Sequence, residues 1–523
     1  MFEFERRGVR LAEWQPLLDG EVPEHRAPVM TSNGATWPLT TGGQITLRQE
    51  QDAGLTRLVV SLEDADVIPL SLGFRVNTIT GVDRYLRNGY HSWDGSYFAQ
   101  PGTPAGEGPR GRSPVLGFAL TALLPQGGGT LVLGFERHDR FQTRLRYGGT
   151  AEAMTLDVET LLDRTGATTG EALLLFDGPE LEPALAHWSE LVAAASPLPP
   201  RVPARRITGW CSWYNLYAAI TEENILEHLA AARRYRDERQ VPLDIFLVDD
   251  GFTPEMGDWL EVKPQFPRGM APLVADIAQA GFTPGLWIAP FLVGNRSHLF
   301  RDHPDWVVRN HDGKPVAEMK FYGEFRWHKR SEEYYCLDIT HPDAAAYISE
   351  VFRVWRHEWG ARYFKTDFMY HGMAHGPHRV RWHEPGLSRV AVYRRMLALI
   401  RNAIGPDALW LGCGAPLWAS IGYVDAMRIG RDIGVTWHGE YSGESLLRDL
   451  PTRLHAHNRL WQADPDCVLL RDRYHELSDK QVELLARFAA SAGGVLMTSD
   501  KLDELPPERA ELFAELLTAG DGP

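Results

Sequence analysis

Carboxyl side chains recur where short apolar runs of the sequence end. Asp249 and Asp250 end the run LDIFLVDD, and Asp367 lies near the end of RYFKTDF. Asp432 comes four residues after Arg428, just beyond YVDAMRIG. Cleavage of a glycosidic bond needs two carboxyl groups, one ionised to attack or to activate water and one protonated to release the leaving group. These residue types and positions therefore favour glycoside cleavage.

The spacing of Lys365 and Asp367 points to a nucleophile. Two residues apart on a strand, their side chains lie on one side of it, and an ammonium group there would keep Asp367 ionised. Asp432 would then serve as the general acid/base from across the sheet. The alternatives are a structural ion pair between Lys365 and Asp367 and a core ion pair made by Arg428.

Aromatic residues and further carboxylates could bind the substrate. The sequence contains 17 Trp, and aromatic faces suit the apolar C–H faces of sugar rings. We expect Trp213 and Trp287 to supply stacking faces and Asp249 and Asp250 to accept hydrogen bonds from sugar hydroxyls. The alternative for any one Trp is a place in a large aromatic core.

These residues need a scaffold that gathers the ends of several strands. From about residue 205, buried-looking strands alternate with amphipathic helices, which is typical of a parallel sheet. Eight strand–helix units in under 300 residues predict a (β/α)8 TIM barrel, whose active site lies at the carboxyl ends of the strands. The predicted strands are 207–214, 243–250, 284–290, 362–368, 409–414, 423–430, 467–472 and 494–500.

The residues before the barrel have a different pattern. Short runs rich in Leu, Val and Thr recur up to about residue 195 and are separated by Gly-rich turns, which predicts an N-terminal β-sandwich over 1–195. The Pro-rich segment 196–204 reads as a linker, and the catalytic barrel is expected over 205–523. The fold class is thus α/β plus β.

Composition excludes several classes of partner. A formal net charge of -15 argues against nucleic acid and against an anionic membrane surface, since both attract a basic face. Four scattered Cys fit a reducing compartment. No signal-peptide pattern and no membrane-spanning stretch is seen, so we expect a cytoplasmic protein.

A histidine-rich loop follows Asp367. It carries His371, His375, His378 and His383, a cluster that could hold a metal ion. Because the loop is rich in Gly and Pro, we expect it to form a mobile rim beside the nucleophile, and we expect no metal site.

Motifs along the barrel resemble the α-galactosidase (melibiase) group, glycoside hydrolase family 36 of the α-galactosidase clan. The segment NGYHSW at 88–93 in the β domain also resembles a family segment. The barrel motifs, in the order of the family, are GWCSWY at 209–214, FLVDDGF at 246–252, GLWIAPF at 285–291, YFKTDF at 363–368, LGCGAP at 411–416 and MRIGRD at 427–432.

The resemblance implies a retaining α-galactosidase acting on galacto-oligosaccharides of the melibiose and raffinose type, without metal or organic cofactor. It implies Asp367 as nucleophile, Asp432 as general acid/base, and Trp93 as a residue that reaches the site from the β domain of the same or a neighbouring subunit. Further residues implied to bind the sugar or line its pocket are Asp249, Asp250, Lys365, Arg428, Trp287, Tyr214 and Cys413. A homo-oligomer is implied too, and the small β domain common after the barrel is not expected, because the chain ends at Pro523.

Other functions remain open at this point. The same machinery would serve an α-N-acetylgalactosaminidase, another α-glycosidase or a transglycosidase of the raffinose-synthase kind. A catalytically inactive sugar-binding protein would be expected to lose one of the catalytic pair, and both Asp367 and Asp432 are present. A metal-dependent barrel hydrolase would want an HxH motif on an early strand, which this sequence lacks.

Overall fold

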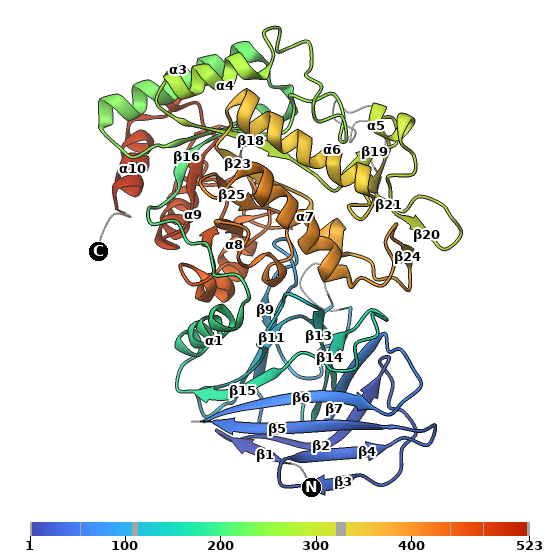
Figure 1. Ribbon diagram of the computed structural model, residues 1–523. Coiled ribbons are helices and arrows are strands. Elements are labelled where there is room, and N and C mark those ends of the chain that lie inside the picture. The colour runs from blue at the N-terminus through green and yellow to red at the C-terminus, as the bar shows by residue number, and fades with distance from the viewer. Residues whose placement is uncertain are drawn as a thin grey trace.

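The structure is a computed structural model of the 523-residue chain. It describes residues 3–52, 54–106, 113–320, 331–439, 441–473 and 475–519. Two bodies are visible in Figure 1: a strand-rich N-terminal part and a barrel ringed by helices, with α1 (Leu181–Ala195) between them. No helix in the described ranges has both the length and the apolar character needed to cross a membrane.

Two antiparallel sheets pack face to face in the N-terminal part, as predicted for a β-sandwich. Their facing Leu, Val, Phe and Trp side chains form a core of their own. The first sheet has the order β1 (Phe4–Arg6), β2 (Val9–Leu18), β7 (Ser71–Thr80), β14 (Met154–Leu161), β13 (Gln142–Gly149) and β10 (Leu116–Gly117). The second has the order β3 (Val29–Thr31), β4 (Gly34–Pro38), β5 (Gln44–Asp52), β6 (Leu55–Glu63), β15 (Leu173–Gly178), β12 (Thr130–Phe135), β11 (Leu120–Leu124), β8 (Arg84–Arg87) and β9 (Tyr97–Ala99).

Eight parallel strands form the barrel in chain order, which confirms the predicted TIM barrel. A parallel bridge between Val468 and Thr498, and a hydrogen bond from the N–H of Val495 to the carbonyl of Ala463 at 2.8 Å, join its last two strands. The strands are β16 (Thr208–Cys211), β17 (Ile245–Val248), β18 (Thr283–Ile288), β23 (Tyr363–Thr366), β25 (Leu409–Gly412), β26 (Ala426–Arg428), β27 (Gln462–Asp464) and β28 (Leu496–Thr498).

Helices and short strands connect the barrel strands. Thr221 caps α3 through a capping box, as the sequence predicts, and Gly360 in the left-handed region ends the π-helical turn Val354–Trp359 that follows α6. The helices are α2 (Trp213–Leu216), α3 (Glu222–Arg239), α4 (Met270–Gln279), α5 (His298–Asp302), α6 (Pro342–Arg353), α7 (Arg389–Ile404), α8 (Gly443–Asp449), α9 (Asp479–Ser491) and α10 (Pro507–Thr518). The short strands are β19 (Leu292–Gly294), β20 (Arg309–Asn310), β21 (Ala317–Lys320), β22 (Glu333–Cys336) and β24 (Val380–Arg381).

The strands are shorter than predicted, and two of the differences bear on the site. The first ends at Cys211 rather than at residue 214, because Trp213 already begins α2. The seventh was predicted over 467–472 and instead lies over Gln462–Asp464. Hydropathy does not reveal this strand, because the polar residue Gln462 lies in it. The side chain of Gln462 bonds the segment just before β16: its Nε2 donates to the carbonyl of Arg205 at 2.6 Å.

The segment between β8 and β9 attaches the sandwich to the mouth of the barrel. The N–H of Ser92 donates to the carbonyl of Ala415 at 3.0 Å, and the N–H of Ala415 donates to Ser92 Oγ at 3.0 Å. Arg453, buried in the barrel, donates to the carbonyl of Ser92 at 2.7 Å. These bonds fix the residues around Trp93 against the strand ends where the predicted site lies. The exact domain bounds 1–195, 196–204 and 205–523 stay a prediction.

Candidate active site

Lys365 and Asp367 lie together at the carboxyl end of β23. The buried Lys365 Nζ lies 2.8 Å from Asp249 Oδ2 and 4.0 Å from Asp367 Oδ2. Trp287, paired with Lys365 across β18 and β23, donates from Nε1 to Asp367 Oδ2 at 3.1 Å. Burial opposes the charge on Lys365, but Asp249 and then Asp367, among other groups, raise the pKa of its ammonium well above the usual value. A cation and an N–H donor therefore face one carboxylate.

The backbone holds the Asp367 carboxylate in one orientation. The N–H of Asp367 donates to the carbonyl of Ile288, and the N–H of Phe368 donates to Asp367 Oδ1, both at 2.8 Å. Phe368 has φ +53°, a left-handed conformation that costs a bulky residue on the order of 1 kcal/mol. Its ring packs edge-on against Trp93, with the centroids 5.1 Å apart. Packing thus supports the strained turn that aims Asp367.

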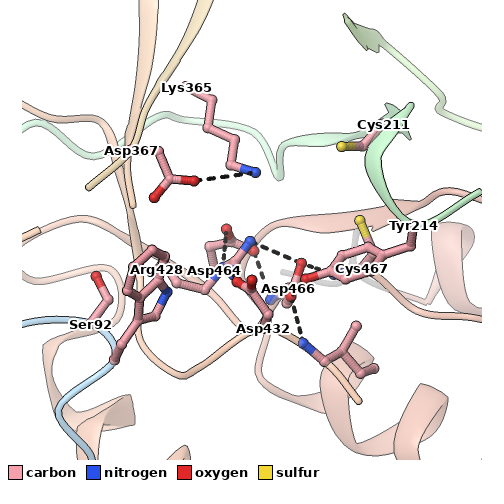
Figure 2. Close-up of polar contacts among 12 residues, drawn as sticks. Ser92, Cys211, Tyr214, Lys365, Asp367, Arg428, Asp432, Asp464, Asp466 and Cys467 are labelled. Carbon is pink, nitrogen blue, oxygen red and sulfur yellow. Dashed lines mark hydrogen bonds and ion pairs between the residues drawn. The ribbon is translucent and has the colours of Figure 1, made fainter. Parts of the chain in front are cut away.

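Arg428, at the end of β26, binds three carboxylates. Its Nη1 donates to Asp432 Oδ1 at 2.9 Å, its Nε to Asp464 Oδ2 at 3.0 Å and its Nη2 to Asp466 Oδ1 at 2.9 Å. Figure 2 shows this group facing the Lys365–Asp367 pair across the site. Because one guanidinium serves three carboxylates, negative charge is in excess here.

The environment of Asp432 favours a protonated carboxyl group. Its side chain remains 37% exposed, while that of Arg428 is 3% exposed. Burial by the surrounding protein raises the pKa of Asp432 to about 6; Arg428 opposes this shift, and Asp466 and Asp367 add to it. A carboxyl group with this pKa can hold a proton near neutral pH, as a general acid must.

Asp249 and Asp250 directly follow β17 and are both buried. Asp249 Oδ2 accepts from Lys365 and from the thiol of Cys211, whose Sγ lies 3.5 Å away, and Oδ1 accepts from the N–H of Asp250 at 2.9 Å. The pair therefore sits beside the predicted nucleophile, as the sequence analysis expects. Its role in binding hydroxyls stays a prediction.

The remaining predicted residues surround the same strand ends. Tyr214 donates its hydroxyl proton to Asp466, and burial raises the pKa of this phenol well above its usual value. Cys413 is fully buried, and burial likewise raises the pKa of its thiol well above the usual value. Trp213 is half-buried and packs edge-on against Tyr217, with centroids 5.3 Å apart.

Trp93 reaches the site from the sandwich of the same chain. Besides Phe368, its ring contacts Tyr370 edge-on at a centroid distance of 6.0 Å. Its carbonyl accepts a hydrogen bond from Arg431 Nε at 2.9 Å, next to Asp432 in sequence. The β domain of the same chain thus contributes a wall to the site.

Asp464 and Asp466 are site residues that the sequence analysis missed. Asp464 ends β27 and Asp466 lies two residues beyond it, whereas hydropathy predicts the strand to begin five residues later, so neither carboxyl group is predicted at a strand end. The motif DPD at 464–466 could have revealed them, because its two carboxylates have the same two-residue spacing as Lys365 and Asp367.

The histidine-rich loop contacts a buried carboxylate beside the site. His371 Nδ1 lies 2.9 Å from Glu318 Oε2, and His375 Nε2 lies 3.1 Å from Glu318 Oε1. Burial opposes ionisation of Glu318, yet its bonds to the two histidines lower its pKa to about 2. The loop is therefore tied to β21 through a buried carboxylate.

A separate group of potential metal ligands lies near α5. Asp258, Glu261 and His298 offer ligand atoms within 4.8 Å of one another. Both carboxylate oxygens of Asp258 accept backbone N–H bonds from the first residues of α5, each at 3.0 Å. This contact caps a helix, which explains the acid without a metal ion.

The known proteins that resemble this chain in sequence are α-galactosidases, as the motifs predict. The family described as Melibiase matches residues 210–403. A probable α-galactosidase C of Aspergillus flavus is 23% identical over 352 residues, covering 60% of this chain and 44% of that protein. An α-galactosidase of Escherichia coli is 25% identical over 163 residues, covering 30% of this chain and 20% of that protein. The chain spans less than half the length of these curated relatives.

Solved structures resemble almost the whole chain. The α-galactosidase TtGalA of Thermus thermophilus, in complex with stachyose, is 28% identical with a TM-score of 0.71, covering 94% of this chain and 99% of that chain. The family 36 α-galactosidase AgaA of Geobacillus stearothermophilus is 13% identical with a TM-score of 0.61, covering 98% of this chain and 73% of that chain, and so shares the fold. By its motifs, its barrel and these relatives, the chain resembles the α-galactosidases, and residues 210–403 match the Melibiase family.

Proposed function

We propose that this protein is a retaining α-galactosidase that removes terminal α-D-galactosyl residues from galacto-oligosaccharides. The observation that carries the proposal is the pairing of two different carboxyl environments at one barrel mouth. Asp367 lies beside an ammonium group and an indole N–H, while the pKa of Asp432 is raised to about 6. One group is thus suited to attack and the other to donate a proton.

In the first half of the reaction, Asp367 attacks the anomeric carbon. A carboxylate oxygen forms a bond to that carbon as the glycosidic C–O bond breaks, and Asp432 gives its proton to the departing oxygen. The product is a covalent galactosyl-enzyme and a free alcohol. Lys365 and Trp287 hold the attacking carboxylate, so little reorientation is needed.

In the second half, Asp432 acts as a base. It takes a proton from water while the water oxygen attacks the anomeric carbon and the bond to Asp367 breaks. Two inversions leave galactose in its original α configuration. Asp432 ends protonated and Asp367 ends ionised, as both began.

Substrate recognition is assigned to the residues around this pair. Asp249 is held by Lys365, Cys211 and a backbone N–H, and its free lone pairs can accept hydroxyl protons. Trp93 supplies an aromatic wall. The relative TtGalA was solved with p-nitrophenyl α-D-galactopyranoside and with stachyose, which supports an α-galactoside as substrate. Hydrolysis over transglycosylation, a cytoplasmic location and a homo-oligomer stay predictions.

The test compares release of p-nitrophenol from the α-galactoside, the α-glucoside and the α-N-acetylgalactosaminide. We expect turnover of the α-galactoside, its loss in Asp367→Ala, and its return with azide as β-galactosyl azide, because azide then attacks from the side that the carboxylate has vacated. Asp407→Ala, on the surface, is the control and should keep wild-type turnover. No turnover of any of the three by folded wild-type protein would contradict the proposal.

A further inference from the structure

Asp466, in the turn after β27, accepts hydrogen bonds from four donors. Its Oδ1 accepts from Arg428 Nη2 at 2.9 Å and from the N–H of Cys467 at 2.7 Å. Its Oδ2 accepts from the N–H of Ile433 at 2.8 Å and from the hydroxyl of Tyr214. The side chain is 1% exposed. A buried carboxylate with this many donors is fixed in place.

Two of these donors hold Asp432 from opposite ends. Ile433 is the next residue in the chain, so its N–H belongs to the peptide group that follows Asp432. Arg428 bonds Asp466 with one terminal nitrogen and Asp432 with the other. Asp466 therefore fixes both the backbone that carries the Asp432 carboxyl group and the guanidinium that contacts it (Figure 2).

Asp464 makes different contacts in the same cluster. It accepts from Arg428 Nε at 3.0 Å and from the N–H of Asp466 at 2.9 Å. It orients Arg428 and Asp466, and no hydrogen bond in the described structure joins it to Asp432 or Ile433. Both carboxylates bond Arg428, but within the described structure Asp466 is the one that also bonds the backbone next to Asp432.

We propose that Asp466 is the positioning residue of the general acid/base: it aims the Asp432 carboxyl group and, by sharing Arg428, keeps that group protonated until the leaving group needs the proton. This inference rests on the proposed glycosidase function. Asp466 lies outside the catalytic pair, and it controls the position and the proton of Asp432.

The charges around Asp432 agree with this role. The negative charge of Asp466 raises the pKa of Asp432, in the same direction as burial and against Arg428. Removing that charge would free Arg428 to neutralise Asp432 more fully and would lower the pKa. The titratable and charged groups around Asp432 lie on or just after β23, β25, β26 and β27 and on α2: Lys365, Asp367, Cys413, Arg428, Asp466 and Tyr214. Asp464 lies behind Arg428 and bonds its Nε.

The experiment measures kcat/KM against pH for wild type, Asp466→Asn and Asp425→Asn. Asp425 is a matched control, a buried carboxylate bonded to Arg201 and Arg401 just before β26 begins, away from the site. Two substrates are compared: melibiose, whose leaving group needs a proton, and 2,4-dinitrophenyl α-galactoside, whose leaving group does not.

For Asp466→Asn we expect the alkaline limb of the profile to move down by about one pH unit. Activity should fall about 10²-fold on melibiose and less than about 10-fold on the dinitrophenyl substrate, since only the first requires the acid. Asp425→Asn should leave both the limb and the ratio of the two activities unchanged. An unmoved limb in Asp466→Asn, or equal losses on the two substrates, would overturn the proposal.

Two further measurements cover the remaining outcomes. If Asp466→Asn does not fold, Asp466→Glu keeps the charge but displaces the acceptor, so melibiose turnover should fall with little change of the alkaline limb. Turnover of melibiose at the wild-type rate would then overturn the proposal.

If wild type cleaves no α-galactoside, the proposed function fails by itself. The pKa of Asp432 is then read from ¹³C NMR of Asp-labelled protein, with Asp432→Asn identifying its signal, and an equal pKa in wild type and Asp466→Asn would overturn the role of Asp466.

Discussion

The two ends of β26 carry charge clusters of opposite composition. At the start of the strand, the carboxylate of Asp425 meets two guanidinium groups, Arg201 at 3.0 Å and Arg401 at 2.6 Å. At its end, the single guanidinium of Arg428 meets three carboxylates. The first cluster has two guanidinium groups for one carboxylate, whereas the second has one guanidinium group for three carboxylates.

This difference separates structure from chemistry within one strand. Where cations are in excess, the carboxylate is held from two sides and acts as a fixed anchor. Where carboxylates are in excess, the one with the fewest bonds takes a proton at a higher pH, and here that one is Asp432. The end of β26 at the barrel mouth can therefore supply a proton.

The largest expected effect comes from removing the shared cation. Arg428→Met leaves Asp464 and Asp466 buried without their guanidinium, so we expect it to lower the free energy of unfolding by about 3–5 kcal/mol. Arg201→Met, at the other end, leaves Asp425 with Arg401 and should cost only about 1–2 kcal/mol. Urea unfolding of both variants measures the contrast. Equal losses would mean that the two clusters do not differ as described.

A smaller effect is expected in the pH dependence of the wild type. Asp432 must be protonated to release a poor leaving group, so kcat/KM for melibiose should fall as pH rises above about 6, where this carboxyl group loses its proton. Turnover of the dinitrophenyl α-galactoside should fall less over the same range. Parallel pH profiles for the two substrates would show that the group titrating there is not the acid.

The smallest effect concerns stability. The pKa of Asp432 is raised from 3.8 to about 6, so the folded state binds this proton more tightly than the unfolded state. The free energy of unfolding therefore decreases as the pH rises from about 4 to 6. Asp432→Asn removes the penalty, so its Tm relative to wild type should be higher at pH 7.5 than at pH 4.5. Asp425→Asn should show no such gain. A Tm difference for Asp432→Asn that is the same at both pH values would contradict this.

Sequence patterns predicted the strand ends that have apolar strands behind them. IFLV and YFKT each end at a boundary that hydropathy marks, so Asp249 and Asp367 could be placed from the sequence. Hydropathy does not mark β27, because the buried Gln462 lies in it and bonds backbone carbonyls. The apolar run beyond it, CVLLRD, has the pattern of a strand instead. Asp464 and Asp466 were lost with it.

Contacts between distant segments could not be predicted in detail. The family resemblance suggested that Trp93 reaches the site, but its packing on Phe368 depends on how the loop between β8 and β9 meets the barrel. The link from Glu318 to the histidine-rich loop joins residues more than 50 apart in sequence, and no local pattern encodes it.

The proposed catalysis depends most on the different roles of Asp367 and Asp432. Incubation with 5-fluoro-α-galactosyl fluoride, which slows release of a covalent intermediate, followed by mass spectrometry of the intact and then digested protein, tests it most directly. We predict one fluorogalactosyl group per chain, attached to the peptide that contains Asp367 and absent from Asp367→Ala. Attachment to another residue, or turnover of an α-galactoside that releases β-galactose first with no adduct, would contradict the account.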